Sequence, residues 1–320
     1  MTDHPYFSKP GQSSGNLAKF WNNGEHCPDA VLVPIEWRYD FARGHAFEAV
    51  CRDHATGSKT FFDDFRVSEI DGDVPENIWK TTHEFSGEKL REKLSALEVM
   101  TLEKKNKKGE VTEPARRNKT YSAQHAYMDE CLASENFGKM PVCQTDYSAM
   151  RELAKSICDL DFPKWHRLRE YKIGNYLAGC QWQTEHYWDD NGIGKKALAD
   201  CLYTQHGNAF PADIKWTSSF SQFKSAFQSH HWIQAAHYER GISASLGVKC
   251  TPMLFLVGCA GGKNAPNLAQ IWSVDKKQRD ELDREYDRLC TEYDAWEKAG
   301  KPKSGKLEER VQRVWTKKSF

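Results

Sequence analysis

The sequence lacks long hydrophobic runs, paired cysteine motifs and an excess of charge of either sign. No apolar segment approaches the about 18 residues of a membrane-spanning helix, and the polar start MTDHPYFSKP lacks the apolar centre of a signal peptide. Ten cysteines are spread along the chain with no CxxC and no zinc-type pairing with histidine. We therefore expect a cytoplasmic protein whose cysteines are reduced.

Charge and composition narrow the class of protein further. The 45 basic and 45 acidic side chains cancel, so a nucleic-acid partner has to be held by local patches and not by a global field. A content of 39% hydrophobic and 12% aromatic residues excludes a disordered, collagen-like or coiled-coil chain. The 320 residues have room for one large domain or two small ones.

Helical periodicity dominates the first half of the chain. It predicts a helical opening with segments at 16–21 and 39–52, one amphipathic helix over 85–102, and further helices between 122 and 169. Residues 103–119 carry seven basic and three acidic side chains and almost nothing apolar. We interpret that segment as a solvated linker or loop.

The second half alternates between strand and helix patterns. Short β-rich or alternating segments separated by turn residues predict three consecutive strands, then a helix, a hairpin and a final helix. The strands are expected at 179–188, 195–203 and 209–216, the helix at 219–241, the hairpin at 251–258 and 268–274, and the last helix from 276 to about 300. This order indicates an α/β fold with a mixed sheet.

Charged residues interrupt the second and third predicted strands. Asp200 lies within an apolar strand, and Asp213 and Lys215 share one face of the next strand, with Ile214 turned toward the core. If these strands are neighbours, two carboxylates, an ammonium group and the Ile214 carbonyl meet at one spot. Hard cations such as Mg²⁺ prefer such oxygen ligands, and the lysine can orient a water that attacks a phosphodiester.

The predicted helix that follows adds two polar side chains. Gln234 and Tyr238 are four residues apart and therefore lie on one helical face. An alternative stays open for each pair. Asp213 and Lys215 can form a protective salt bridge on an edge strand, and Gln234 and Tyr238 can be solvated residues at the rim of a core helix.

The series of a strand Asp, D-x-K, a threonine and a helix with Q-A-A-x-Y resembles the PD-(D/E)XK nuclease superfamily, and within it the RecE-like exonucleases (exodeoxyribonuclease VIII type) of phages and prophages. This resemblance implies a restriction-endonuclease-like core, with a central mixed sheet flanked by helices. It also implies that Asp200, Asp213 and the Ile214 carbonyl bind Mg²⁺ or Mn²⁺. The implied catalytic residues are Asp200, Asp213, Lys215, Gln234 and Tyr238, and Thr217, Ala235 and Ala236 complete the pattern.

The likeness extends to the N-terminal part, where SSGNLAKFW and RGHAFEAV resemble two helices of the family. Glu48 stands where the family has a histidine ligand, and it is a chemically competent ligand for a hard metal. A surface glutamate on an amphipathic helix is the alternative. Ala199 replaces a proline that often precedes the metal aspartate. On the preceding strand either Gln183 or Glu185 is expected to face the site, and the sequence does not choose between them.

The resemblance implies a Mg²⁺-dependent exodeoxyribonuclease that hydrolyses linear double-stranded DNA from its ends in phage-type recombination. The expected partners are DNA ends, a single-strand-annealing protein and further copies of the chain. A single nuclease domain is then expected over 1–320, with an N-terminal helical part (1–102), a basic loop (103–121), a catalytic core (122–274) and a C-terminal helix with a basic tail (275–320).

Positive charge for DNA contact is dense in two stretches, 104–119 and 298–318. The family has an Arg-Lys-rich turn at the place of the first, so Arg116, Arg117 and Lys119 are the expected DNA contacts. Two other functions stay open: an endonuclease or repair nuclease of the same fold, and a catalytically inactive DNA-binding module. The iron–sulfur subclass is disfavoured because the cysteines do not cluster.

Overall fold

A computed structural model of the chain describes most of its residues and divides them into two compact units. Unit 1 comprises Met1–Glu36 with Ile157–Phe320, and unit 2 comprises Trp37–Ser156. The prediction of a single nuclease domain over the whole chain stays a prediction. The described residues are 6, 9–21, 29–32, 39–70, 74–97, 100–101, 104–106, 109–113, 116–117, 122–133, 138–190, 192–261 and 265–302.

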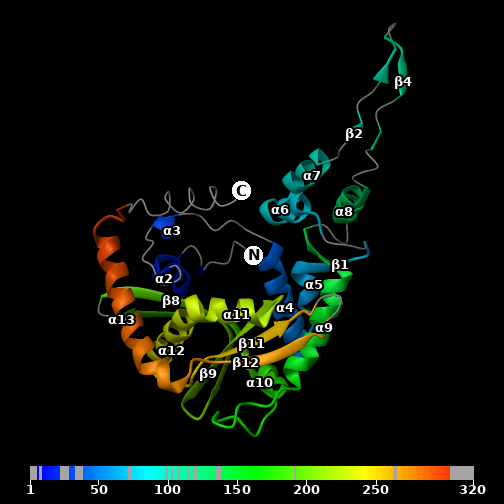
Figure 1. The fold of residues 1–320 in the computed structure, drawn as a ribbon. Coiled ribbons are helices and arrows are strands. Elements are labelled where there is room, and N and C mark those ends of the chain that lie inside the picture. Colours follow the sequence, from blue (N-terminus) through cyan, green and yellow to red (C-terminus); the bar gives the residue numbers. More distant parts are fainter. Residues whose placement is uncertain are drawn as a thin grey trace. The chain divides into compact units, whose positions relative to one another are not determined.

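Unit 1 is built on a six-stranded mixed sheet (Figure 1). Its strand order is β12-β11-β9-β8-β7, and β10 also pairs with β9. β7, β8 and β9 form an antiparallel meander. β10 and β11 run parallel to β9, and β12 is antiparallel to β11. The predicted meander and hairpin are therefore confirmed. The strands are β7 (Gln181–Asp190), β8 (Ile193–Gln205), β9 (Asn208–Thr217), β10 (Lys249–Cys250), β11 (Leu254–Cys259) and β12 (Leu268–Trp272).

Helices flank this sheet, as expected for the α/β fold class. α12 (Trp232–Leu246) packs on β7, β8 and β9, and its buried Ile233 and Ile242 join the core of the unit. α2 (Ser14–Trp21) and α13 (Lys276–Lys298) pack against α12, and α10 (Ile173–Gly179) contacts β8. α3 (Asp29–Leu32) lies beside α2. A mixed sheet with helices around it is thus established, and the finer superfamily core remains to be argued.

Local sequence sets the bounds of the helices near the sheet. The Ser219 hydroxyl accepts hydrogen bonds from the Ser221 and Gln222 N–H groups at the start of α11 (Phe220–Ala226). Gly247, with φ of 65°, ends α12 in the left-handed conformation that glycine adopts freely. Between α11 and α12 the π-helical turn η2 (Phe227–His231) interrupts the predicted continuous helix. The wider turn shifts the helical phase before Gln234 and Tyr238.

Unit 2 combines helices with short strand pairs. The hydrophobic residues Ile78, Leu90, Leu94 and Tyr127 form a core among α6, α7 and α8. The parallel pair of β1 with β6 was not predicted, because four-residue apolar segments do not differ from the adjoining helical pattern. The elements are α4 (Tyr39–Thr56), α5 (Phe61–Asp64), β1 (Phe65–Ser68), α6 (Glu76–Glu84), α7 (Gly87–Ala96), α8 (Ser122–Leu132), β6 (Met140–Cys143) and α9 (Gln144–Cys158).

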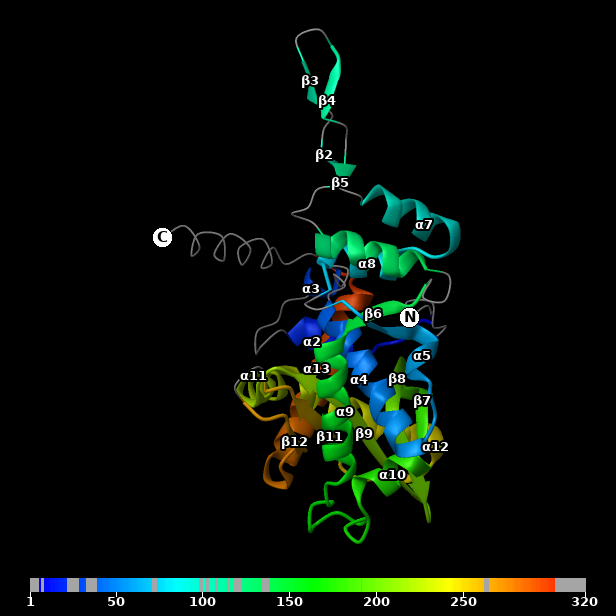
Figure 2. The same ribbon diagram turned by 90° about the vertical axis from the view of Figure 1, so that its right-hand side faces the viewer.

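The basic segment of unit 2 forms strand pairs, so its prediction as a linker or loop was wrong. β2 (Met100–Thr101) pairs with β5 (Arg116–Arg117), and β3 (Lys104–Lys105) pairs with β4 (Val111–Glu113), both antiparallel. Figure 2 shows the two pairs in succession. Gly109, with φ of 81°, lies in the turn between β3 and β4. Strands made of charged residues carry no apolar alternation, which is the signal that sequence reasoning uses.

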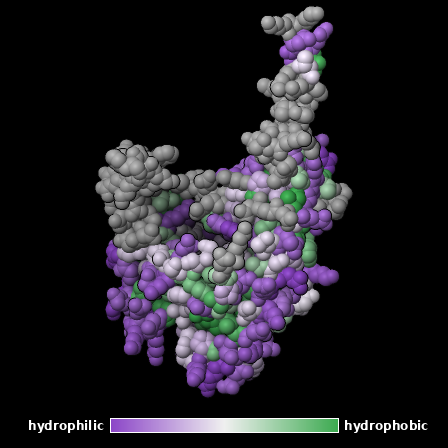
Figure 3. All heavy atoms as spheres, turned by 45° about the vertical axis from the view of Figure 1, so that its right-hand side comes forward, coloured by the Kyte–Doolittle hydropathy of each residue, from purple (hydrophilic) through white to green (hydrophobic). Residues whose placement is uncertain are grey.

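The surface of the described residues is mostly polar. On the face shown in Figure 3, hydrophilic residues cover most of the described area, and hydrophobic residues gather in limited patches. Among the helices that the structure describes, none combines the length and the apolar character that crossing a membrane requires.

Candidate active site

The candidate active site lies where β8 and β9 part. The antiparallel ladder between the two strands ends at the pair Cys201 and Ala212. The same register sets Asp200 opposite Asp213 one residue further on. β9 continues beside β11, where Asp213 pairs with Phe255. The two predicted carboxylates therefore come from neighbouring strands, at the point where the sheet opens between them.

A segment near the start of the chain takes the place beside β8 that β9 leaves. The Gln12 N–H donates to the Gly194 carbonyl at 2.9 Å, and the Lys196 N–H donates to the Gln12 carbonyl at 3.0 Å. The buried Lys196 ammonium donates to the carbonyls of Tyr6 at 2.8 Å and Lys9 at 2.5 Å. Burial lowers the pKa of this lysine. The two backbone bonds of Gln12 satisfy part of the backbone of β8 beyond the end of its ladder with β9.

The buried carboxylate of Asp213 has one cationic and one neutral polar neighbour. Its side chain is 1% exposed, whereas that of Lys215 is 28% exposed. The Lys215 Nζ lies 2.6 Å from Oδ2, and the Gln234 Nε2 donates to Oδ1 at 2.8 Å. β9 is an interior strand between β8 and β11. The pair is therefore no surface salt bridge, because Asp213 is buried, but a purely structural role for it stays an alternative.

Tyr238 lies one helical turn after Gln234 on α12 and is buried. Burial, and then the negative charges of Asp200 and Asp213, raise the pKa of its hydroxyl far above the usual range. The hydroxyl therefore stays protonated and is able to donate a hydrogen bond. The helical spacing seen in the sequence thus brings both polar residues of α12 to the two carboxylates.

Gln183 on β7 faces Asp200, whereas Glu185 does not. The Gln183 Nε2 lies 3.4 Å from the Asp200 Oδ1. Glu185 instead lies 2.8 Å from the Lys9 ammonium and accepts a hydrogen bond from the Tyr187 hydroxyl at 2.5 Å. Gln183 also has φ of 52°, a left-handed conformation that is strained for a residue with a side chain. This local strain re-aims one side chain of β7 toward the site.

Two histidines near Lys215 were not singled out in the sequence. The partly buried ring of His231 stacks on that of Phe223 with centroids 5.2 Å apart. Burial, and then the charge of Lys215, lower the pKa of His231 to about 3, and the same two causes lower the pKa of His230. Both rings are therefore neutral at pH 7 and add no charge beside the lysine. The sequence carried no signal for them, because the π-helical turn η2 that holds them lies within a segment predicted as one continuous helix.

The other predicted residues lie in different parts of the chain. Ile214 is 4% exposed and lies in β9 between Asp213 and Lys215. Glu48 belongs to α4 of unit 2, where its Oε2 lies 3.9 Å from the His45 Nδ1, and its role as a metal ligand stays a prediction. Arg116 and Arg117 form β5 of unit 2, and Lys119 lies outside the described residues. Their contact with DNA also stays a prediction.

The donor set suits a hard cation better than zinc. Within the described ranges, no group of three or more His, Cys, Asp and Glu side chains comes together in a way that could hold a metal ion. Asp200 and Asp213 offer two carboxylates and Ile214 offers a carbonyl. Mg²⁺ keeps several waters and takes one or two protein carboxylates, whereas a structural zinc site takes four nitrogen or sulfur ligands. The residues present therefore fit Mg²⁺ or Mn²⁺.

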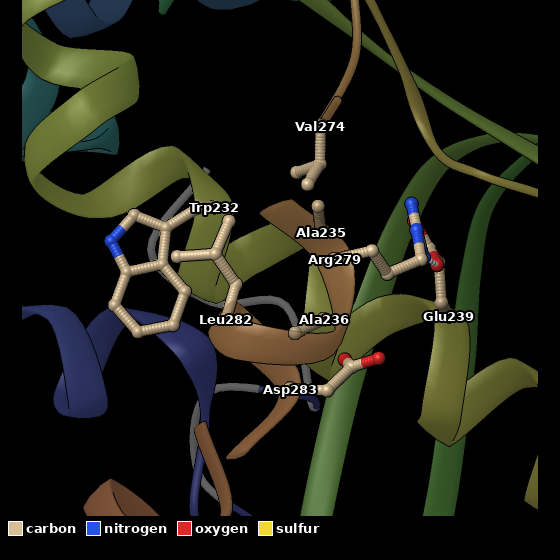
Figure 4. A pocket seen from close by; sticks show the side chains of 8 residues that line it. All are labelled: Trp232, Ala235, Ala236, Glu239, Val274, Arg279, Leu282 and Asp283. Carbon is tan, nitrogen blue, oxygen red and sulfur yellow. Dashed lines mark hydrogen bonds and ion pairs between the residues drawn. The ribbon is translucent and has the colours of Figure 1, made fainter. Parts of the chain in front are cut away.

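An ion pair fixes the helix that carries Gln234 and Tyr238 (Figure 4). Glu239 of α12 accepts a hydrogen bond from the Met253 N–H at 2.7 Å and is held by both terminal nitrogens of Arg279 from α13. Figure 4 shows the Arg279 and Glu239 side chains pointing toward each other beside Val274. The neighbouring cavity has a volume of only ≈ 10 Å³, room for one water at most. This pocket is therefore structural and takes no ligand.

Comparisons with known proteins leave the function to be argued from the site. No protein-family model matches the chain, and no curated protein is significantly similar to it in sequence. The crystal structure of a candidate exonuclease from Eubacterium rectale is similar, with a TM-score of 0.47 and 12% identity over 92% of this chain and 83% of that one. A likeness at this level assigns no activity.

Proposed function

We propose that this protein is a metal-dependent nuclease that hydrolyses phosphodiester bonds of DNA with Mg²⁺ or Mn²⁺. One observation carries the proposal: the buried Asp213 contacts Lys215 and Gln234, and it lies, like Asp200, one residue beyond the last pair of the β8–β9 ladder. The resemblance of this residue series to the PD-(D/E)XK superfamily supports the same reading.

Each side chain has a distinct task in this proposal. Lys215 has a partly exposed ammonium on a strand fixed by its neighbours, so it orients the attacking water or offsets charge on the phosphoryl oxygens. Gln234 holds the Asp213 carboxylate in one orientation through its hydrogen bond. The protonated Tyr238 hydroxyl lies within reach of the charges of Asp200 and Asp213 and hydrogen-bonds with the Gln234 side chain. Gln183 supports Asp200 from β7.

Asp200, Asp213 and the Ile214 carbonyl would hold the cation. When bound, Mg²⁺ neutralises negative charge on the phosphoryl oxygens. A cation held there would share the Asp213 carboxylate with Lys215, whose ammonium would add positive charge beside the site.

The substrate that we propose is the end of linear double-stranded DNA, cleaved in phage-type recombination beside a single-strand-annealing protein. This choice rests on the resemblance to the RecE-like branch, with Arg116, Arg117 and Lys119 as DNA contacts. A homo-oligomer is consistent with that function, because a cyclic assembly encloses a duplex.

The test compares end-labelled linear duplex with covalently closed circles of the same sequence, each with Mg²⁺ and with EDTA. We expect the linear duplex to be degraded only with Mg²⁺ and the closed circles to persist. Cleavage of circles at a comparable rate would instead identify an endonuclease or repair nuclease of the same fold. DNA binding that needs no metal and leads to no cleavage of either substrate would identify a catalytically inactive module.

A further inference from the structure

A second surface of unit 1 carries aromatic and basic side chains that the proposed reaction does not use. It belongs to the loop 159–172, which lies between α9 and α10. This loop has four basic and three acidic side chains. Its outward residues, here called the Trp165 surface, are Lys164, Trp165, Arg167, Arg169, Tyr171 and Lys172, and all are exposed.

The loop is held in one conformation by its inward residues. The rings of Phe162 and His166 stack with centroids 4.6 Å apart at 10°, and His166 meets Phe210 edge-on at 5.7 Å. Leu168 is 4% exposed. The Ile173 N–H donates to the Leu160 carbonyl at 2.9 Å and closes the loop at its base. A partner therefore meets a surface that is already ordered, which lowers the entropy lost on binding.

The exposed rings on this loop are unusual for a soluble surface. Trp165 is 54% exposed and Tyr171 is 50% exposed. The acidic residues near them form ion pairs whose ends are mostly exposed, Lys172 with Asp161 at 2.7 Å and Arg169 with Glu170 at 3.2 Å. Water screens such pairs strongly, so the guanidinium and ammonium groups stay available to an anionic partner.

We propose that the Trp165 surface binds a single-stranded nucleic acid. Exposed aromatic rings stack on bases whose faces are free, and interleaved basic side chains bind the phosphates between them. A duplex covers the faces of its bases and offers no such stacking. An acidic peptide would satisfy the charges but would leave the two rings without planar partners.

The surface is connected to the candidate active site through one strand. Arg167 Nη1 donates to Asn208 Oδ1 at 2.7 Å, and Asn208 is the first residue of β9. Asp213 is the fifth residue after Asn208 along β9, a path of about 17 Å. The inference rests on the proposed nuclease function only for the source of the single-stranded nucleic acid, because binding itself requires no cleavage.

The test measures fluorescence anisotropy of a labelled oligothymidylate on the full chain in EDTA, where the proposed cleavage is blocked. We expect Trp165→Ala and Tyr171→Ala each to weaken binding by about 5- to 150-fold, the range found for single base-stacking residues. The double variant of Arg167→Ala with Arg169→Ala should reduce the slope of log affinity against log salt by about 1.4, because it removes two phosphate contacts. Trp165→Phe should retain most of the affinity.

Matched controls come from the same unit. Leu246→Ala removes another exposed apolar side chain, and Lys276→Ala with Lys277→Ala removes two exposed charges from α13, so both should bind as the wild type does. Melting temperatures of all variants identify any loss that comes from unfolding. Unchanged binding in Trp165→Ala and Tyr171→Ala, or equal competition by blunt duplex or polyglutamate, would overturn the inference. Wild-type binding by Lys215→Ala supports it even if no variant cleaves DNA, which separates it from the nuclease proposal.

Discussion

Two lysine–aspartate pairs lie in the same sheet with the same separation and opposite burial. Lys215 Nζ is 2.6 Å from Asp213 Oδ2, and Lys195 Nζ is 2.6 Å from Asp190 Oδ2. In the first pair the aspartate is 1% exposed and the lysine 28%, whereas in the second the lysine is 1% exposed and the aspartate 36%. Distance does not distinguish the two pairs, but the location of the buried charge does.

The surroundings of each ammonium explain the difference. Lys195 also lies 3.3 Å from the Cys290 sulfur and 5.2 Å from the centre of the Tyr286 ring, so its charged end is enclosed. Lys215 pairs with a buried carboxylate, and its side chain is 28% exposed. Under the proposed function, this exposure lets Lys215 meet a substrate. The enclosed Lys195 has the arrangement of a packing residue.

The largest expected effect tests the chemical role of Lys215. Lys215→Ala should lower the rate of DNA cleavage by about 10² to 10⁴, the usual cost of removing a positioned proton-transfer group. Its unfolding free energy without metal should fall by about 1 to 3 kcal/mol, because the buried Asp213 loses its cationic neighbour. That second loss should shrink as Mg²⁺ is added, since a ligand of the folded state stabilises it. Initial rates and thermal unfolding on one preparation measure both.

A Lys215→Ala protein with full activity and slightly lower stability would contradict the catalytic role. It would make the pair a structural ion pair like that of Lys195, and most of the support for the D-x-K motif would go with it. DNA binding by the variant, measured in EDTA, should stay near that of the wild type because phosphate contacts are spread over many basic groups.

The second prediction is that substitutions of Lys195 change the stability of the fold and not the rate of cleavage. Lys195→Ala should destabilise the fold by about 2 to 4 kcal/mol, because it removes a buried four-carbon stem as well as a charge. Lys195→Met should cost less than about 1.5 kcal/mol, since the stem is retained and the half-exposed Asp190 returns to water. Cleavage per folded molecule should stay near the wild-type rate in both variants. A hundredfold lower rate of DNA cleavage in a Lys195 variant with an unchanged melting temperature would contradict this prediction and give Lys195 a functional role like that of Lys215.

The sequence predicted the parts of this site that follow from strict periodicity. Alternation along β9 set Asp213 and Lys215 on one face, and a spacing of four residues on α12 set Gln234 above Tyr238. Turn residues between apolar segments predicted the meander that makes Asp200 and Asp213 neighbours. These features depend on local geometry, which the order of residue types contains.

The features that the sequence did not predict depend on tertiary contacts. A left-handed backbone at a glutamine has no sequence signal, so the choice of Gln183 over Glu185 required the structure. The same holds for the partner that covers β8 beyond its ladder, because Gln12 lies far from Lys195 in the chain. The short pairs in 100–117 were missed since their strands are charged, and no apolar face marks them.

The third prediction concerns the loss of stability at low pH that the buried His237 causes near the Lys195 end of the sheet. His237 is fully buried, its Nε2 donates to the Lys196 carbonyl at 2.9 Å, and its Nδ1 accepts from the Tyr286 hydroxyl at 2.7 Å. Burial lowers the pKa of this ring to about 3, below the value of about 6.5 in an unfolded chain. The unfolded state therefore binds the proton more strongly, and the contribution of His237 is complete above about pH 6.5 and lost as the pH falls toward 3.

At pH 5 we expect His237 to contribute about 2 kcal/mol less to the free energy of unfolding than it does at pH 7. Urea unfolding at a series of pH values measures the slope. His237→Gln keeps a donor and an acceptor but has no proton to bind, so its stability should depend less steeply on pH by about that amount. Parallel curves for the two proteins would show that another buried group, such as His166 or His231, governs the acid response.

The smallest expected effect comes from a third lysine pair, in which both ends reach water. Lys9 and Glu185 are 2.8 Å apart with side chains 46% and 25% exposed. Water screens such an exposed pair, so Glu185→Gln should leave the melting temperature nearly unchanged. Cleavage should stay within about threefold of the wild-type rate, because Gln183 and not Glu185 contacts Asp200. Gln183→Ala, made in parallel, should slow cleavage by more than Glu185→Gln does. If Glu185→Gln instead stopped cleavage without changing the melting temperature, the carboxylate would belong to the metal site and burial would no longer separate functional from structural pairs in this sheet.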